Sequence, residues 1–368
     1  MKRRLTYNQR RAIKRWSVLA LSAAVLAGAF ASIPYIVSAL PDITRAARSA
    51  ELPEAQPVFA LGGGGVYPRE YDFTAIEPED NAEDTGSLPD VSDEVSFDPP
   101  EPGEDDFPVL TMNLCRYDSP DKAALLITNR TKYSVDLESF ASKDFPLTGP
   151  IGDEPLVLVI HTHGSESYLR NGYEFYSSSE KFRSVRDESV TVVHIGDVLC
   201  ERLSELGIPT YHDRTMYDTT DFNKSYTYSR KGINQALEKY PSIRFVIDLH
   251  RDSIFSSKGT NIKPIAAIDG KNAAQLMIVV GTDEGGANHP GWKTNLTVAA
   301  HLQQMMNGLY PMLARPVNLR SASFNQALTK GSLLLECGSC GNTVEEAEYA
   351  ITLFAEAYAC MLKDEYDR

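Results

Sequence analysis

Two histidines and two glutamates are the side chains of this sequence best suited to chemistry. His163 and Glu166 lie three residues apart after an apolar run, and His250 and Glu336 each follow another apolar run. Two histidines and one carboxylate, with one position left open, form a common ligand set for a catalytic zinc ion. A separate glutamate can then serve as general base, so the four residues together predict zinc-assisted hydrolysis of an amide.

The stretch LLLECGSCGN, residues 333–342, adds a Cys-x-x-Cys pair directly after Glu336. Such a pair could be a redox dithiol or half of a zinc site. The chain has no second pair to complete a four-cysteine site, and its five cysteines form no disulfide framework. We therefore expect Cys337 and Cys340 to fill a turn of small residues.

Other histidines have plainer interpretations. His161 would face the opposite side of its strand from its neighbour, which favours a packed or supporting group. His194 and His212 fall inside a predicted helix and a predicted strand, and we expect structural roles for both. His289 lies in a loop with Trp292, where it is either a surface residue or part of a substrate rim.

The elements that must position these side chains alternate from residue 154 onward. Continuous apolar runs ending in polar residues are typical of buried parallel strands, and segments with helical spacing separate them. Thr343 and Glu346 predict a capping box at the start of the last helix. The alternation predicts a three-layer α/β domain with a mostly parallel sheet. The expected strands are 156–164, 208–215, 244–253, 275–283 and 332–339, and the expected helices are 190–207, 226–241, 292–311 and 343–367.

Ligands of such a sheet bind beyond the carboxyl ends of its strands. His163, His250 and Glu336 would therefore meet at one edge, and His289 would join them from the loop after strand 275–283. Arg251, beside His250, supports this placement because a charged group at a buried strand end is costly without a function.

The N-terminal third predicts an anchor and a tether. Residues 17–40 contain no charged side chain and would span ~36 Å as a helix, more than the ~30 Å core of a bilayer. A cleaved signal peptide remains the alternative, although its apolar region would be shorter. Basic residues precede the span, so the positive-inside rule places the N-terminus in the cytoplasm and residues 41–368 outside. Residues 41–106 are acidic and proline-rich, which predicts a disordered linker.

The segment after the linker is expected to be a small lead-in with a hairpin turning near Asn129 and Arg130. The net charge of −14 argues against a nucleic-acid partner. The expected organisation is a basic tail (1–16), a transmembrane helix (17–40), the linker (41–106), the lead-in (107–153) and a catalytic domain (154–368).

Five motifs together resemble the stage II sporulation protein P family, which consists of membrane-anchored peptidoglycan hydrolases. They occur in the family's order and cover about residues 110–368: IHTHGSESY, VVHIGD, DLHRDS, HPGWKTNL and FNQALTKGSLLLECGSCGNTVEEA. The resemblance implies an amidase-3-like fold and a zinc-dependent N-acetylmuramoyl-L-alanine amidase, with endopeptidase activity as a further expectation. The substrate would be the septal cell wall during engulfment, at the outer face of the cell membrane, with sporulation proteins D and M as partners.

The resemblance also implies roles for individual residues. His163 and His250 would bind zinc, and Glu336 would be the general base. The third ligand would be Glu166 in the first motif or Glu188 at the start of the next helix, and Glu166 is preferred.

Other residues would assist. Because Arg251 shares the strand-end location, we expect it to stabilise an oxyanion or to orient a ligand. We expect Asn325 and Gln326 to contact the peptide stem, and His289 and Trp292 to lie at the substrate rim.

Two rival interpretations remain. A catalytically inactive wall-binding scaffold would keep the fold and the anchor. A serine or cysteine hydrolase could use Ser165 or Cys337 with His250, but the sequence has no G-x-S-x-G nucleophile elbow.

Overall fold

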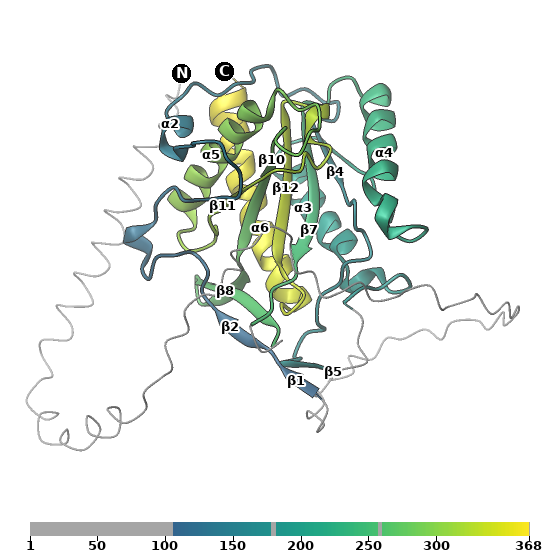
Figure 1. Ribbon diagram of the computed structural model, residues 1–368, viewed down its shortest axis with the longest axis vertical. Coiled ribbons are helices and arrows are strands. Elements are labelled where there is room, and N and C mark those ends of the chain that lie inside the picture. The colour runs from purple at the N-terminus through teal and green to yellow at the C-terminus, as the bar shows by residue number, and fades with distance from the viewer. Residues whose placement is uncertain (1–105, 178–181, 257–259, 368) are drawn as a thin grey trace, which may run out of the picture. The chain divides into compact units, whose positions relative to one another are not determined.

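The computed structural model describes residues 106–177, 182–256 and 260–367, and the fold is given for these residues alone (Figure 1). The predicted membrane span, 17–40, and nearly all of the predicted linker lie outside them. Within the described residues, no helix is both long and apolar enough to cross a bilayer.

Seven of the described strands form the central sheet, in the order β3-β11-β10-β12-β7-β4-β6. Five of its six pairings are parallel, so the predicted mostly parallel sheet is confirmed. β10 is antiparallel to β12, and this one step divides the sheet into two blocks of opposite direction. The strands are β3 (Ile127–Asn129), β4 (Val157–Ile160), β6 (Thr210–His212), β7 (Phe245–Asp252), β10 (Leu276–Gly281), β11 (Val317–Arg320) and β12 (Gly331–Ser339).

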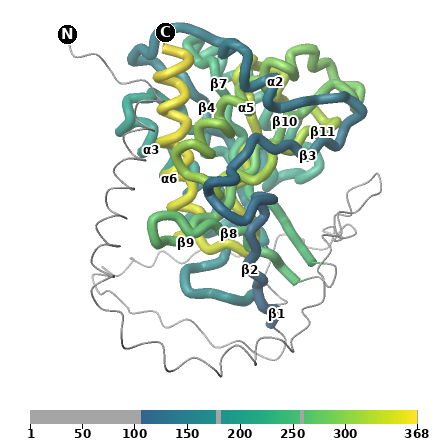
Figure 2. Tube along the Cα trace, turned by 90° about the vertical axis from the view of Figure 1, so that its left-hand side faces the viewer, coloured from purple at the N-terminus to yellow at the C-terminus, as the bar shows by residue number. Residues whose placement is uncertain are grey.

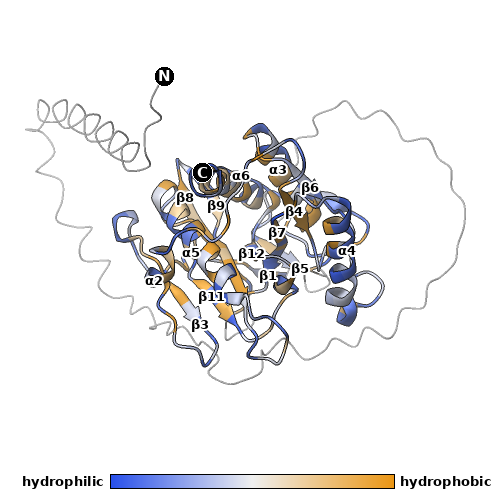
Figure 3. Cartoon of the chain, turned by 90° about the horizontal axis from the view of Figure 1, so that it is seen from above, coloured by the Kyte–Doolittle hydropathy of each residue, from blue (hydrophilic) through white to orange (hydrophobic). Residues whose placement is uncertain are grey.

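Helices cover both faces of this sheet, as Figure 3 shows. On one face, α4 (Ser225–Lys239) packs Ile233 and Ala236 against the apolar side chains of β4 and β7. On the other face lie α3 (Val192–Glu205), α5 (Trp292–Leu309) and α6 (Val344–Met361), which pack against one another. The buried strands are apolar on both faces, which explains their continuous apolar runs.

The predicted capping box of the last helix is confirmed. The Thr343 hydroxyl accepts the backbone N–H of Glu346, and the Glu346 carboxylate accepts the N–H of Thr343. The Glu346 carboxylate also lies 3.0 Å from the buried Nζ of Lys263. These contacts fix the turn between β12 and α6. At its C-terminal end, α6 continues as a π-helical turn, Leu362–Tyr366.

The predicted hairpin near Asn129 and Arg130 is wrong. β3 pairs in parallel with β11, which is far away in sequence, and forms one edge of the central sheet. After it, α2 (Leu137–Ala141) packs against α5. The lead-in segment therefore contributes a strand and a helix to the same body as the predicted catalytic domain.

Five short strands lie beyond the end of the sheet at which β7 ends (Figures 1 and 2). β1 pairs with β5, and β8 pairs with β2 and β9. Three of them are only three residues long, too short for an alternating pattern to predict them. The five are β1 (Asp106–Pro108), β2 (Leu110–Met112), β5 (Phe175–Ser177), β8 (Ile262–Ile268) and β9 (Lys271–Ala274).

Candidate active site

Three adjacent parallel strands deliver the predicted catalytic side chains. β4 and β12 flank β7, and Glu336 of β12 lies directly opposite His250 of β7 in the strand register. His163 follows β4 by three residues, at the same carboxyl edge. The structure thus brings together three residues that are up to 173 positions apart, from 163 to 336.

His250 is almost fully buried between two carboxylates. Its Nδ1 atom lies 3.4 Å from Oε2 of Glu166. Its Nε2 atom lies 2.9 Å from Oδ1 of Asp248, at an angle that gives an ion pair rather than a hydrogen bond. Burial lowers the pKa of His250, but Asp248 and Glu166 outweigh it and hold the pKa well above its usual value.

Glu166 is the acidic partner of this pair. Burial raises its pKa, but Arg251 and the histidines outweigh that effect and lower the pKa to about 2. One of its oxygens also accepts the backbone N–H of Arg251 at 3.1 Å. Glu166 is therefore held as a carboxylate beside His250.

His163 is held by ring contacts. Its imidazole stacks on Phe222 with ring centroids 4.4 Å apart, and it meets His250 edge-on at 5.5 Å. Its Nδ1 atom lies 4.0 Å from Oδ2 of Asp218. Burial lowers the pKa of His163, which keeps the ring in the neutral form that binds metals.

Glu336 has the opposite character to Glu166. Burial, and then the nearby charge of Asp252, raise the pKa of Glu336 to about 8. A carboxyl group whose pKa lies near neutral pH can both accept and donate a proton, as a general base must in amide hydrolysis.

The Arg251 guanidinium is buried and binds protein acceptors. Its guanidinium donates to the carbonyls of Ser167 and Phe182 and to the Ser253 hydroxyl. Since its backbone N–H also binds Glu166, the geometry fits the expected role in orienting a ligand and does not fit contact with an oxyanion.

The alternative third ligand lies apart from the histidines. Glu188 is exposed, and its carboxylate lies 2.6 Å from the Arg214 guanidinium. Asp187, its neighbour, pairs with Arg170 at 2.5 Å and accepts the N–H of Ser189. The structure therefore brings Glu166, and not Glu188, next to His250.

The placement of His289 and Trp292 corrects the sequence prediction. Because β10 runs antiparallel to β12, the loop after β10 opens at the edge opposite the catalytic residues. His289 is buried there against Asn295 of α5, which in turn binds the Ser332 carbonyl at the start of β12. Neither His289 nor Trp292 can line the predicted substrate rim.

Asn325 and Gln326 are also buried rather than open to a peptide. Gln326 binds the backbone of Val279 and Gly281 in β10. The Asn325 amide donates to the Tyr226 carbonyl and to the Ser229 hydroxyl of α4. Their side-chain amides fasten the loop before β12 to its neighbours, which corrects the expectation of stem contacts.

The remaining predictions concern packed groups. The His161 imidazole is fully buried, and it contacts the Leu249 carbonyl and Nε2 of His212. His194 pairs with Glu348 of α6 at 2.6 Å. The Cys337 thiol points to a carbonyl of α6, and the Cys340 thiol points to Asn261. The two free cysteines thus have separate structural environments.

Sequence reasoning missed three groups that hold the histidines. Asp248 contacts His250, Asp218 faces His163, and Phe222 stacks on His163. Asp248 could have been found, because a carboxylate inside an apolar strand needs a partner. Asp218 lies in a turn and Phe222 begins a single 3-10 turn, Phe222–Lys224, and segments this short carry no periodic pattern.

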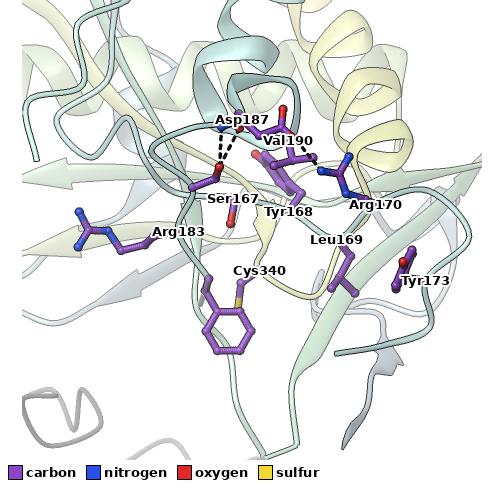
Figure 4. Close-up of a pocket in the computed structure, with 11 residues that line it drawn as sticks. Ser167, Tyr168, Leu169, Arg170, Tyr173, Arg183, Asp187, Val190 and Cys340 are labelled. Atoms are coloured by element: carbon purple, nitrogen blue, oxygen red, sulfur yellow. Dashed lines mark hydrogen bonds and ion pairs between the residues drawn. The ribbon is translucent and has the colours of Figure 1, made fainter. Parts of the chain in front are cut away.

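A cavity of about 200 Å³ lies against the segment that carries Glu166 (Figure 4). Its wall includes Ser167, Phe182, Arg183 and Cys340. The cavity therefore borders the chain that positions the site.

The candidate ligands are of the side-chain types that bind Zn²⁺ in proteins. Two imidazoles and a carboxylate are present, and buried Nδ1 of His163, Nε2 of His250 and Oε2 of Glu336 have no hydrogen-bond partner among the described residues. Within the described ranges, no three histidine, cysteine or acidic side chains converge closely enough to enclose an ion. The residues fit zinc by chemistry, and His250 is ion-paired with Glu166 and Asp248.

Comparison with known proteins identifies relatives. The family described as stage II sporulation protein P matches residues 126–359. Stage II sporulation protein P of Bacillus subtilis (strain 168) is 28% identical over 235 residues, which cover 61% of this chain and 55% of that protein. The chain thus matches about half the length of this relative.

Solved structures of amidases are also similar. An N-acetylmuramoyl-L-alanine amidase from Clostridium difficile 630 is 14% identical, with a TM-score of 0.33, over 58% of this chain and 96% of that one. The N-acetylmuramyl-L-alanine amidase Ami1 from Mycobacterium smegmatis is 12% identical, with a TM-score of 0.33, over 57% of this chain and 95% of that one.

Proposed function

Because the chain belongs to the stage II sporulation protein P family, we propose that it is a peptidoglycan hydrolase that cleaves the N-acetylmuramoyl-L-alanine amide bond during sporulation. One observation carries the chemical part of this proposal. Glu336, with its pKa raised to about 8, lies opposite His250 in the strand register, and Oε2 of Glu166 lies 3.4 Å from Nδ1 of His250.

The residues that would hold Zn²⁺ are His163, His250 and Glu166. When bound, Zn²⁺ supplies a Lewis acid that polarises the scissile carbonyl. Asp248 and Asp218 lie beside the two imidazoles, where a carboxylate orients the ring and raises its basicity.

Glu336 would move the proton. Its carboxylate accepts a proton from the attacking water and later donates it to the leaving L-alanine nitrogen. Both transfers need a group whose pKa is close to the working pH, and burial gives Glu336 such a pKa.

The geometry disfavours a serine or cysteine nucleophile. The Ser165 hydroxyl donates to Asp218 and accepts from Arg183, so its hydrogen-bond partners do not include the histidine that a serine hydrolase would use as its base. Burial raises the pKa of the Cys337 thiol to about 12, and a neutral thiol is a poor nucleophile.

Finer points of the proposal rest on family membership. They are endopeptidase activity, partnership with sporulation proteins D and M, and action on the septal wall from an anchor at 17–40. The length and apolar character of residues 17–40 support the anchor.

The direct test compares the purified chain with its Glu336→Gln variant on isolated cell-wall fragments, with the products identified by mass spectrometry. We expect the wild type to release L-alanine-terminated stem peptides. We expect Glu336→Gln to lower kcat by ~10²–10⁴-fold, the usual contribution of a general base.

A matched control is Glu345→Gln, because Glu345 is an exposed carboxylate of the same strand–helix region. It should retain wild-type kcat. A wild-type chain that binds wall fragments and releases no product would instead favour the inactive scaffold. Equal rates for Glu336→Gln and wild type would remove Glu336 as the base.

A further inference from the structure

Among the described residues, five large hydrophobic side chains are exposed. Val185 is 59% exposed, Phe107 and Leu110 are each 47% exposed, Phe222 is 46% exposed and Phe255 is 37% exposed. Single exposed hydrophobic residues need no explanation, but a group of them at one place indicates a binding surface.

Three of these side chains lie near the catalytic edge. Phe222 stacks on His163, and Phe255 follows the end of β7 by three residues. Leu110 begins β2, and its N–H binds the carbonyl of Asn261, which bridges to Phe255. The exposed apolar area therefore lies where the three catalytic strands end.

Four aromatic rings connect part of this area into an aromatic row, consisting of Phe107, Tyr176, Phe182 and Phe255. Phe107 stacks on Tyr176 at 5.9 Å, and Tyr176 meets Phe182 edge-on at 5.0 Å. Phe182 meets Phe255 edge-on at 5.9 Å. The row ends at exposed phenyl rings, Phe107 at one end and Phe255 at the other.

The row is continuous with the catalytic cluster. The Phe182 carbonyl accepts hydrogen bonds from the Arg251 guanidinium and from the Ser167 N–H. The Arg251 N–H in turn binds Glu166, the carboxylate beside His250. The row is therefore joined through Phe182 to the residues that hold the candidate site.

We propose that the aromatic row binds a glycan strand of the cell wall, which the row aligns with the catalytic cluster. The inference rests on the proposed function, because the glycan strand is part of the peptidoglycan that is proposed as the substrate. A neutral pyranose ring presents an apolar face of C–H groups, and the electron-rich face of an aromatic ring attracts such groups.

The test measures binding of the full chain to purified sacculi by sedimentation, for wild type and for Phe107→Ala, Phe255→Ala and the double variant. We expect each single variant to bind about fivefold more weakly, as loss of one aromatic contact implies. When sacculi are the substrate, the concentration of sacculi that gives the half-maximal rate should also rise about fivefold in each single variant. The corresponding concentration of one soluble muramyl peptide should not change.

Two matched series identify the occupant. Phe107→Tyr and Phe255→Tyr keep the ring and should bind sacculi like wild type. Phe107→Leu and Phe255→Leu keep apolar area without a ring and should bind as weakly as the alanine variants. Leucine variants that bind normally would overturn sugar stacking in favour of a general apolar contact.

Other outcomes separate this inference from the proposed function. Alanine variants that bind sacculi normally, or that lose binding to anionic lipid vesicles alone, would overturn the glycan site. A wild type that cleaves no muramyl peptide, and whose sacculus binding still depends on the two rings, would refute the proposed hydrolase and support the aromatic row. Unchanged melting temperatures will show that the variants are folded.

Discussion

Glu166 and Glu336, the two glutamates beside His250, have environments that shift their pKa values in opposite directions. The pKa of Glu166 is lowered to about 2 because Arg251 and the histidines outweigh burial. The pKa of Glu336 is raised to about 8 because burial and Asp252 act in the same direction. Groups whose pKa values are driven apart in this way identify which residue stays charged and which exchanges protons.

This difference predicts that removing the base stabilises the metal-free protein. The folded pKa of Glu336, about 8, exceeds its ordinary value of 4.5, so between these pH values the folded state binds more protons than the unfolded state. Wild-type stability therefore falls as pH rises from 4.5 to 8. At pH 8, Glu336→Gln should raise the free energy of unfolding by about 4 kcal/mol relative to wild type, measured by urea denaturation with a chelator present.

The control has the opposite sign. The folded pKa of Glu166 lies below 4.5, so its ionised form adds stability above pH 4.5 that disappears as pH falls toward 2. Glu166→Gln should therefore destabilise the protein at pH 7, with the difference from wild type shrinking below pH 4.5. If Glu336→Gln and wild type lose stability in parallel from pH 4.5 to 8, the raised pKa is refuted.

At the scale of elements, the sequence was most informative where a strand is buried on both faces. β4, β7 and β12 appear as apolar runs that end in polar residues, and parallel pairing brings His163, His250 and Glu336 to one edge. The direction of β10 could not be predicted, because a buried run is the same in either direction. His289 was misplaced for that reason.

Irregular segments set a second limit. Phe222 and Asp218 lie in the region between β6 and α4, and only the tertiary fold brings them to His163. The lead-in strand β3 likewise depends on a partner almost two hundred residues away, β11. Local patterns cannot report such contacts.

The junction of β12 and α6 allows a quantitative test. Thr343→Ala removes the hydroxyl that caps the Glu346 N–H, and it should lower the free energy of unfolding by ~1 kcal/mol. Thr343→Ser keeps the hydroxyl and should lose much less. The midpoint of urea unfolding, at unchanged m-value, measures both; equal losses for the two variants would show that the hydroxyl contributes nothing.

On the scale of the whole molecule, the candidate ligands join distant parts of the chain. His163, Glu166 and His250 lie on segments that touch only in the folded protein. A metal held by these residues must therefore bind the folded state far better than the unfolded chain.

Zinc should accordingly stabilise the protein as a whole. At a free Zn²⁺ concentration of about 1,000 times Kd, linkage adds ~4 kcal/mol to the free energy of unfolding. Calorimetry should show a higher Tm with zinc than with a chelator. The rise should vanish in His163→Ala and persist in His194→Ala, whose imidazole pairs with Glu348 away from the site. A rise of equal size in both variants would place the zinc elsewhere.

The antiparallel pairing of β10 and β12 has a consequence for how the sequence of such a protein can evolve. Loops after β4, β7 and β12 open at the catalytic edge, whereas loops after β10 and β11 open at the opposite edge. Insertions near Gly285 and Gly286 would lengthen the opposite edge and alter none of the catalytic residues. One sheet thus lets natural selection remodel a loop on one side while the chemistry on the other side stays fixed.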